Sequence, residues 1–113
     1  MTIEEFLVAY LSTKLPVHVS GDVPSPRPSR FVTVEQTGSS TANHVYSPTV
    51  AVQSWAGSRT EASELNELVK TVMAEAVYAP EISRCKLDTD YNFPDLETLH
   101  PRYQAIFEIT FLG

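Results

Sequence analysis

Cys85 is the only cysteine in the 113-residue chain and the clearest candidate for a nucleophile. A nucleophilic thiol needs a neighbouring base, and three histidines could supply one: His18, His44 and His100. The alternative is that Cys85 is a small apolar residue buried on a strand. We favour the buried position, because a free cysteine is among the residue types most often found inside proteins.

Two further groups of polar residues could do chemistry. Asp88 and Asp90 are two residues apart, which places both on one face of a strand, and His100 follows after a loop. Together these three side chains could hold a hard cation. His18 and Asp22 could form an acid–base pair. For both groups we favour a simpler interpretation, a solvated strand end for the first and a polar pair beside a turn for the second.

The short motifs of known enzyme classes do not occur in the sequence. It has no G-x-S-x-G, no H-E-x-x-H and no C-x-x-C motif. Its four glycines are too few to build a phosphate-binding loop easily. The sequence therefore predicts a protein that is not an enzyme, with no catalytic residue, no cofactor and no metal ion.

The segment GDVPSPRPSR, residues 21–30, has prolines at three alternate positions: Pro24, Pro26 and Pro28. Proline fixes φ, lacks an N–H and restricts the preceding residue to extended geometry. We expect a stiff, polyproline-like strap that forms no ladder hydrogen bonds. Arg27 and Arg30 flank the last proline and could pair with carboxylates on another surface. The strap either crosses the protein's own sheet or is a preorganised contact segment for assembly.

Three large aromatic residues could contribute to an interface. Trp55 ends a strand just before a glycine, where it is either a core residue or an anchor of the kind enriched at binding hot spots. Tyr91 and Phe93 lie in the stretch YNFPDL, beside Pro94. These two side chains pack either on their own sheet or on a neighbouring subunit, and the sequence leaves both possibilities open.

Two capping boxes predict where the helices begin. A T-x-x-E box at Thr2 precedes a helix expected over about Ile3–Lys14, which Pro16 ends. An S-x-x-E box at Ser58 precedes a second helix, expected over about Thr60–Tyr78. The apolar stripe of this second helix comprises Leu65, Leu68, Val69, Val72, Met73 and Ala76.

Five strands are expected from alternating or apolar patterns. They are VHVS, Phe31–Gln36, SPTVAVQSWAG, ISRCKLDTDY and RYQAIFEITFL. TGSSTANH should be a polar turn or flexible hairpin tip, and NFPDLETLHP a long loop. We expect the last strand to be the longest and to lie centrally. The order α-β-β-β-α-β-β predicts an α+β domain, with two helices against a mostly antiparallel mixed sheet of about five strands.

Length and composition favour one globular domain over residues 1–113. The chain is 42% hydrophobic, and no apolar run approaches the ~20 residues of a membrane span, so we expect no membrane contact. The N-terminal stretch is acidic, unlike a signal peptide, which predicts a cytosolic protein. The net charge is −6 and the basic residues are scattered, so the basic patch of a nucleic-acid-binding protein is missing.

Three stretches resemble the tail terminator proteins of long-tailed phages and prophages of actinobacteria. The first is the pattern V-P-x-x-R-P-x-R-F-V-x-V-x-x-T-G, matched at residues 23–38. V-Q-x-W-A follows at residues 52–56, and H-P-R-Y-Q at residues 100–104. The resemblance covers nearly the whole chain, and the three patterns occur in the same order. One departure is the turn TGSSTANH, where the family would have more glycine or arginine.

The resemblance implies a structural role in the virion, at the head–tail interface, with assembly in the cytoplasm of the host bacterium. Terminator proteins form a ring, usually a hexamer, that caps the tail tube and stops its polymerisation. The ring then contacts head-completion proteins, and DNA passes through it without specific binding. Arg102 would stand at a loop–strand junction, able to bridge to an acidic neighbour. The expected assembly interface comprises Pro24, Pro26, Arg27, Pro28, Arg30, Trp55, Tyr91, Phe93 and Arg102.

Three alternatives remain open. The chain could be a head–tail connector or stopper of the phage neck, which has a similar size and shape. It could be a small cytosolic enzyme that uses Cys85 or the Asp88, Asp90 and His100 group. It could also be a monomeric ligand-binding module, which would require a deep apolar pocket.

Overall fold

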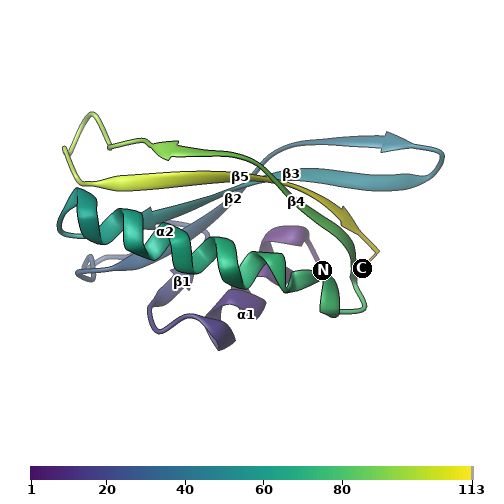
Figure 1. The fold of residues 1–113 in the computed structure, drawn as a ribbon, viewed down its shortest axis with the longest axis horizontal. Helices are drawn as coiled ribbons and strands as arrows, with labels where there is room; N and C mark the ends of the chain where they lie inside the picture. The colour runs from purple at the N-terminus through teal and green to yellow at the C-terminus, as the bar shows by residue number, and fades with distance from the viewer. Residues whose placement is uncertain (113) are drawn as a thin grey trace.

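Two helices cover one face of a five-stranded sheet and leave the other face without a helix (Figure 1). The structure is a computed structural model that describes residues 1–112. The elements follow the order α1 Ile3–Lys14, β1 His18–Ser20, β2 Phe31–Ala42, β3 Val45–Trp55, α2 Arg59–Ala74, the short 3₁₀ helix η1 Ala76–Tyr78, β4 Ile82–Asn92 and β5 Arg102–Phe111. The predicted α+β class and the predicted order α-β-β-β-α-β-β are confirmed.

Both helices begin at their predicted caps. The Thr2 hydroxyl accepts a hydrogen bond from the Glu5 backbone N–H, and the Glu5 carboxylate accepts one from the Thr2 N–H. Ser58 accepts from the Glu61 backbone N–H in the same way. The second helix is shorter than predicted, because its last turn tightens into η1. Leu68 is 38% exposed, so its assignment to the buried stripe was wrong.

The sheet has the strand order β1-β2-β3-β5-β4. β1 pairs with β2 in parallel, and the other three pairings are antiparallel. β5 lies inside the sheet, but the central strand is β3. β5 has 10 residues and β2 has 12, so the prediction that the last strand is the longest and central was wrong. That prediction failed because β2 continues through a stretch that was expected to be a turn.

The core lies between the two helices and one face of the sheet. β5 supplies Ala105, Phe107, Ile109 and Phe111 to this face, as its alternating pattern predicted. Neighbouring strands and both helices complete the core with aliphatic side chains, including Leu7, Leu11, Val50, Val52, Leu65 and Met73. Successive side chains of a strand point to opposite faces of the sheet. The residues that point into the core therefore determine which residues lie on the opposite face.

β2 and β3 extend beyond the sheet as a two-stranded arm, Gly38–Thr49 (Figure 1). The predicted turn TGSSTANH is mostly strand, and only Asn43 and His44 turn the chain, with φ of 52° and 64°. Two successive positive φ values fit a tight hairpin turn, and asparagine tolerates them well. β5 pairs with β3 no further than Thr49, so the arm has no third strand.

No helix within residues 1–112 is long and apolar enough to cross a membrane.

Candidate functional site on the open face of the sheet

The strand register aligns three predicted interface segments on the face that no helix covers. Phe31 of β2 lies opposite Trp55 of β3, and Trp55 lies opposite Arg102 of β5. Two residues further along these strands, on the same face, Thr33 lies opposite Gln53. The result is two adjacent rows of side chains that cross the sheet, which we call the arginine–aromatic row and the polar row.

The arginine–aromatic row is a continuous stack around Trp55. The rings of Phe31 and Trp55 are stacked, with centroids 5.3 Å apart. The guanidinium of Arg27 lies 5.1 Å from the Trp55 centroid, and that of Arg102 lies 4.7 Å from it. Arg102 also lies 4.5 Å from the Phe93 centroid. Trp55 is only 3% exposed, so it is a core residue beneath the two arginines rather than an exposed anchor.

The polar row is a chain of hydrogen bonds that joins four strands. Trp55 Nε1 donates to Thr33 Oγ1 at 3.0 Å, and Thr33 Oγ1 donates to Gln53 Oε1 at 2.7 Å. Gln53 Nε2 donates to Gln104 Oε1, and Gln104 Nε2 donates to the Tyr91 hydroxyl, both at 2.7 Å. Because each bond restricts the next side chain, the row holds this end of the open face in one arrangement.

Arg27 attaches the proline strap to the row. No residue from 21 to 30 pairs with a strand, as predicted, but the segment bends at several points. The predicted polyproline-like conformation over residues 23–28 is therefore interrupted by a bend at residues 25 and 26. Pro24 and Pro28 are half-buried, whereas Pro26 and Arg30 are exposed. Arg27 is the strap residue whose charged group reaches the aromatic rings.

Asp95 organises the loop between β4 and β5. Its carboxylate accepts hydrogen bonds from the Thr98 hydroxyl at 2.7 Å and from the Glu97 N–H at 3.1 Å, and its carbonyl accepts from the Leu99 N–H. The hydrogen bond from Thr98 is the main cause of the lowered pKa of Asp95. Arg102 Nε donates to the Phe93 carbonyl at 2.7 Å and closes the loop against the sheet.

This ordered loop presents apolar side chains to solvent. Leu96 is 84% exposed and Leu99 is 78% exposed, with Leu99 at a φ of 59°. Tyr91 and Phe93 are about two-fifths exposed and contact each other edge to face, at 5.6 Å. The two aromatic residues therefore pack partly on their own sheet and retain a free side. Exposed leucines on a loop held in one shape are typical of a contact surface.

Two hollows lie beside the rows. One has a volume of about 240 Å³ and is lined by Arg27, Pro28, Ser29, Phe31, Trp55, Ala56, Gly57 and His100. The other, of about 440 Å³, lies between the strap and the loop and is lined by Gly21, Asp22, Val23, Thr33, Glu35, Gln53, Trp55, Asp95 and Arg102. Both hollows are lined in part by charged side chains, Arg27 in the first and Asp95 and Arg102 in the second.

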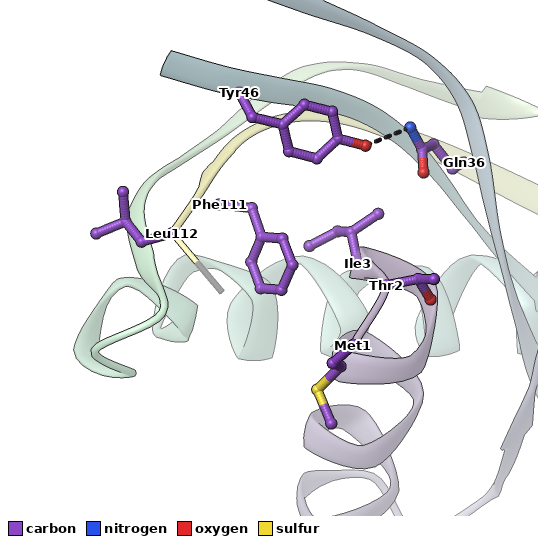
Figure 2. Close-up of a pocket in the computed structure, with 7 residues that line it drawn as sticks. All are labelled: Met1, Thr2, Ile3, Gln36, Tyr46, Phe111 and Leu112. Atoms are coloured by element: carbon purple, nitrogen blue, oxygen red, sulfur yellow. Dashed lines mark hydrogen bonds between the residues drawn. The ribbon is translucent and has the colours of Figure 1, made fainter. Parts of the chain in front are cut away.

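A third pocket, of about 350 Å³, lies away from the rows, at the base of the arm (Figure 2). It is lined by Met1, Thr2, Ile3, Gln36, Tyr46, Phe111 and Leu112. Figure 2 shows the Tyr46 hydroxyl beside Gln36, whose Nε2 donates to it at 2.8 Å. None of these residues is Asp, Glu, His, Lys or Arg, so this pocket mainly offers shape and apolar contact.

The structure does not assemble the metal site considered from the sequence. Asp90 faces the helices, where its carboxylate accepts from Asn66 at 2.8 Å and pairs with Lys70 at 2.9 Å. His100 lines the 240 Å³ hollow on the open face instead. Among residues 1–112, no three acidic, histidine or cysteine side chains are grouped as metal ligands. His18 and Asp22 are both exposed, and no hydrogen bond joins them within the described chain.

Cys85 lies on β4 and packs against the core, as the favoured interpretation predicted, but it is half-buried rather than fully buried. Burial raises the pKa of its thiol to about 11. A raised pKa removes thiolate at neutral pH, so this environment disfavours a nucleophile.

Alkylation provides a test of this environment. We expect iodoacetamide at pH 8 to label Cys85 about 100-fold more slowly in the folded chain than in urea, because the thiolate fraction falls with the rise in pKa. The unfolded thiol ionises first, so stability should fall as pH rises from about 9 to about 11. Equal labelling rates in the two states would contradict this partly buried environment.

Sequence reasoning missed the polar row and the position of His100. Thr33 and Gln53 occupy the alternate, outward positions of strands whose other positions are buried valines. This alternation was visible in the sequence, but it does not say which outward residues meet across strands. Comparison of the chain with protein-family models and with curated proteins finds no match. Functional inference therefore depends on the three sequence patterns and on this geometry.

Proposed function

We propose that this chain is the tail terminator of a long-tailed phage, a structural protein that caps the tail tube as a ring. One observation carries the proposal. The three stretches that resemble terminator proteins lie far apart in the sequence, yet each contributes one member to a single stack: Arg27, Trp55 and Arg102. The resemblance thus corresponds to one three-dimensional unit rather than to three unrelated matches.

This unit supports assembly because it holds two contact segments in place. Arg27 secures the strap and Arg102 secures the loop, so neither segment has to be ordered when a partner binds. The loop offers Leu96 and Leu99 as apolar contacts. A ring that meets a tube on one side and a head-completion protein on the other needs more than one such surface on each subunit.

A head-to-tail ring requires two different contact patches on each subunit, and the two free edges of this sheet are candidates for them. β4 is an edge strand of 11 residues, and within residues 1–112 it pairs only with β5. At the other edge, β1 covers β2 only as far as Thr33. The N–H of Gln36 donates to Glu4 at 2.6 Å, which leaves the arm as the free part of that edge. Unpaired strand edges are templates for pairing with another chain.

We infer that β4 of one subunit contacts the arm of the next. A two-stranded hairpin is marginally stable without further packing, so the arm gains most from lying on another chain. The ring, usually a hexamer in this family, would sit in the virion at the head–tail interface after assembly in the bacterial cytoplasm. The negative net charge is compatible with a lumen that repels DNA and lets it pass without specific binding.

A head–tail connector or stopper is the second candidate, because a small ring-forming domain with two free edges would also serve there. Specific binding to the ends of tail tubes distinguishes the two roles.

The test is the mass of the chain by light scattering across a concentration series, alone and with purified tail tubes. We expect a ring of about six 12.6 kDa subunits, or binding confined to tube ends. Assembly on a template can be weak in isolation, so the tube is part of the measurement. A monomer that ignores tubes at every concentration would contradict the proposed function. A ring that ignores tubes would favour the connector.

A further inference from the structure

The 240 Å³ hollow beside Trp55 has an unusual lining. The strap, the start of β2, the end of β3 and the loop before β5 all contribute to it. The residues of this hollow, which we call the Arg27 pocket, thus come from all three stretches that carry the family resemblance. Its volume is large enough for a small side chain or ligand.

Two polar nitrogen atoms of the Arg27 pocket have no partner. Arg27 Nη1 and His100 Nδ1 are buried and make no hydrogen bond within residues 1–112. Only four buried side-chain polar atoms in the described chain lack a partner, and two of the four belong to residues of this pocket. Leaving a buried polar group without a partner is unfavourable, so such groups usually mark a place where a ligand or water binds.

The charge of Arg27 is also uncompensated. The ion pairs of residues 1–112 join Lys70 to Glu67 and to Asp90, and none involves Arg27. Its guanidinium lies over the rings of Phe31 and Trp55. Those rings contact the cation but accept few of its five N–H donors, which lie in the guanidinium plane. A planar acceptor with two oxygens would match these donors.

The start of α2 adds a second favourable field. Gly57 lines the pocket and directly precedes Ser58, the N-cap of α2. The N-terminal end of a helix favours negative charge. The nearby carboxylate of Glu61 accepts from the Ser58 hydroxyl at 3.1 Å, and the ion pairs of residues 1–112 do not join it to Arg27.

We propose that the Arg27 pocket binds a carboxylate, and that an acidic side chain of a second copy supplies it in the assembled ring. The chain carries 14 acidic and 8 basic residues, so a neighbouring copy offers many carboxylates and few competing cations. The assignment of a second copy as the carboxylate donor rests on the proposed ring. The binding of a carboxylate in the pocket does not. A salt bridge at this point would join the strap of one subunit to the next.

Fluorescence tests the chemistry directly, because Trp55 is the only tryptophan and lines the pocket. Glutarate is titrated into the full chain at constant ionic strength, with sodium chloride as the blank. We expect a saturable change in Trp55 emission, with Kd raised about tenfold or more in Arg27→Gln. His100→Gln should weaken binding as well. The matched control is Arg30→Gln, which removes an exposed strap arginine outside the pocket and should bind like the wild type.

Three results would overturn the pocket: no saturable change in the wild-type chain, equal loss in Arg30→Gln, or unchanged binding in Arg27→Gln. If circular dichroism shows that Arg27→Gln does not fold, the titrations of His100→Gln and of the wild type still test whether the pocket binds a carboxylate. Light scattering with glutarate then tests the source. A smaller mass at saturating glutarate supports a second copy as the donor, and an unchanged ring overturns it. A chain that binds glutarate but neither forms a ring nor binds tube ends contradicts the proposed function, while the carboxylate pocket stands.

Discussion

Replacing Trp55 with alanine is expected to lower the free energy of unfolding by about 3–5 kcal/mol. The side chain is 3% exposed, stacks on Phe31 and lies beneath two guanidinium groups. Its removal leaves a cavity and takes away the surface on which Arg27 and Arg102 rest. The loss is large against the 5–15 kcal/mol that stabilises a typical domain. Urea denaturation followed by circular dichroism measures the change without tryptophan fluorescence.

Trp55→Phe is the matched control. Phenylalanine keeps an aromatic surface for the two arginines but removes the Nε1 donor to Thr33. Thr33 still donates to Gln53, so the polar row loses one bond rather than its continuity. We expect a loss of about 1–2 kcal/mol from the missing hydrogen bond and the smaller ring. A loss below 1 kcal/mol in Trp55→Ala would show that the stack is not a stabilising unit.

The helices and strands were predictable because their signals are local. A capping motif specifies a helix start within four residues. The box at Thr2 is complete in the structure, whereas at Ser58 the side chain caps the Glu61 N–H without the reciprocal bond to the Ser58 N–H. Alternation along β5 correctly assigned its buried face. The arm was not predictable in the same way. Its polar residues, Thr37–Ala42, have the composition of a turn, and only cross-strand pairing with β3 keeps them extended.

The candidate site was predicted as a set of residues but not as an arrangement. Arg27, Trp55 and Arg102 were each singled out from the sequence, yet nothing local shows that they stack. Their contact depends on the register of β2, β3 and β5, which is a long-range property. For the same reason His100 was grouped with the wrong partners. Its proximity to Asp90 in sequence concealed that the two side chains lie on opposite faces of the sheet.

Replacing Leu87 with proline is expected to abolish the ring while the monomer stays folded. Within β4 the backbone N–H groups alternate between β5 and the free edge, except at the register shifts between Ile82 and Arg84 and between Leu87 and Thr89. Phe93 N donates to the Arg102 carbonyl at 2.8 Å, and Leu112 N donates to the Glu81 carbonyl at 2.7 Å. Both bonds involve even-numbered residues on the β5 side, so the even-numbered residues of β5 are the ones that bond to β4. Lys86 lies opposite Glu108, so its N–H points towards β5, whereas Leu87 lies opposite Phe107, so its N–H points to the free edge. Proline is tolerated on an edge strand where the N–H faces away from the sheet.

Lys86→Pro is the control that separates the edge from the fold. It removes a hydrogen bond to β5 and should destabilise the monomer by about 1–3 kcal/mol. Leu87→Pro should leave the unfolding midpoint close to that of the wild type. Light scattering and binding to tube ends measure assembly for both variants. A folded Leu87→Pro chain that still forms rings would show that subunits meet elsewhere. The strap and the loop would then be the contacts to test next, because Arg27 and Arg102 already hold both in place.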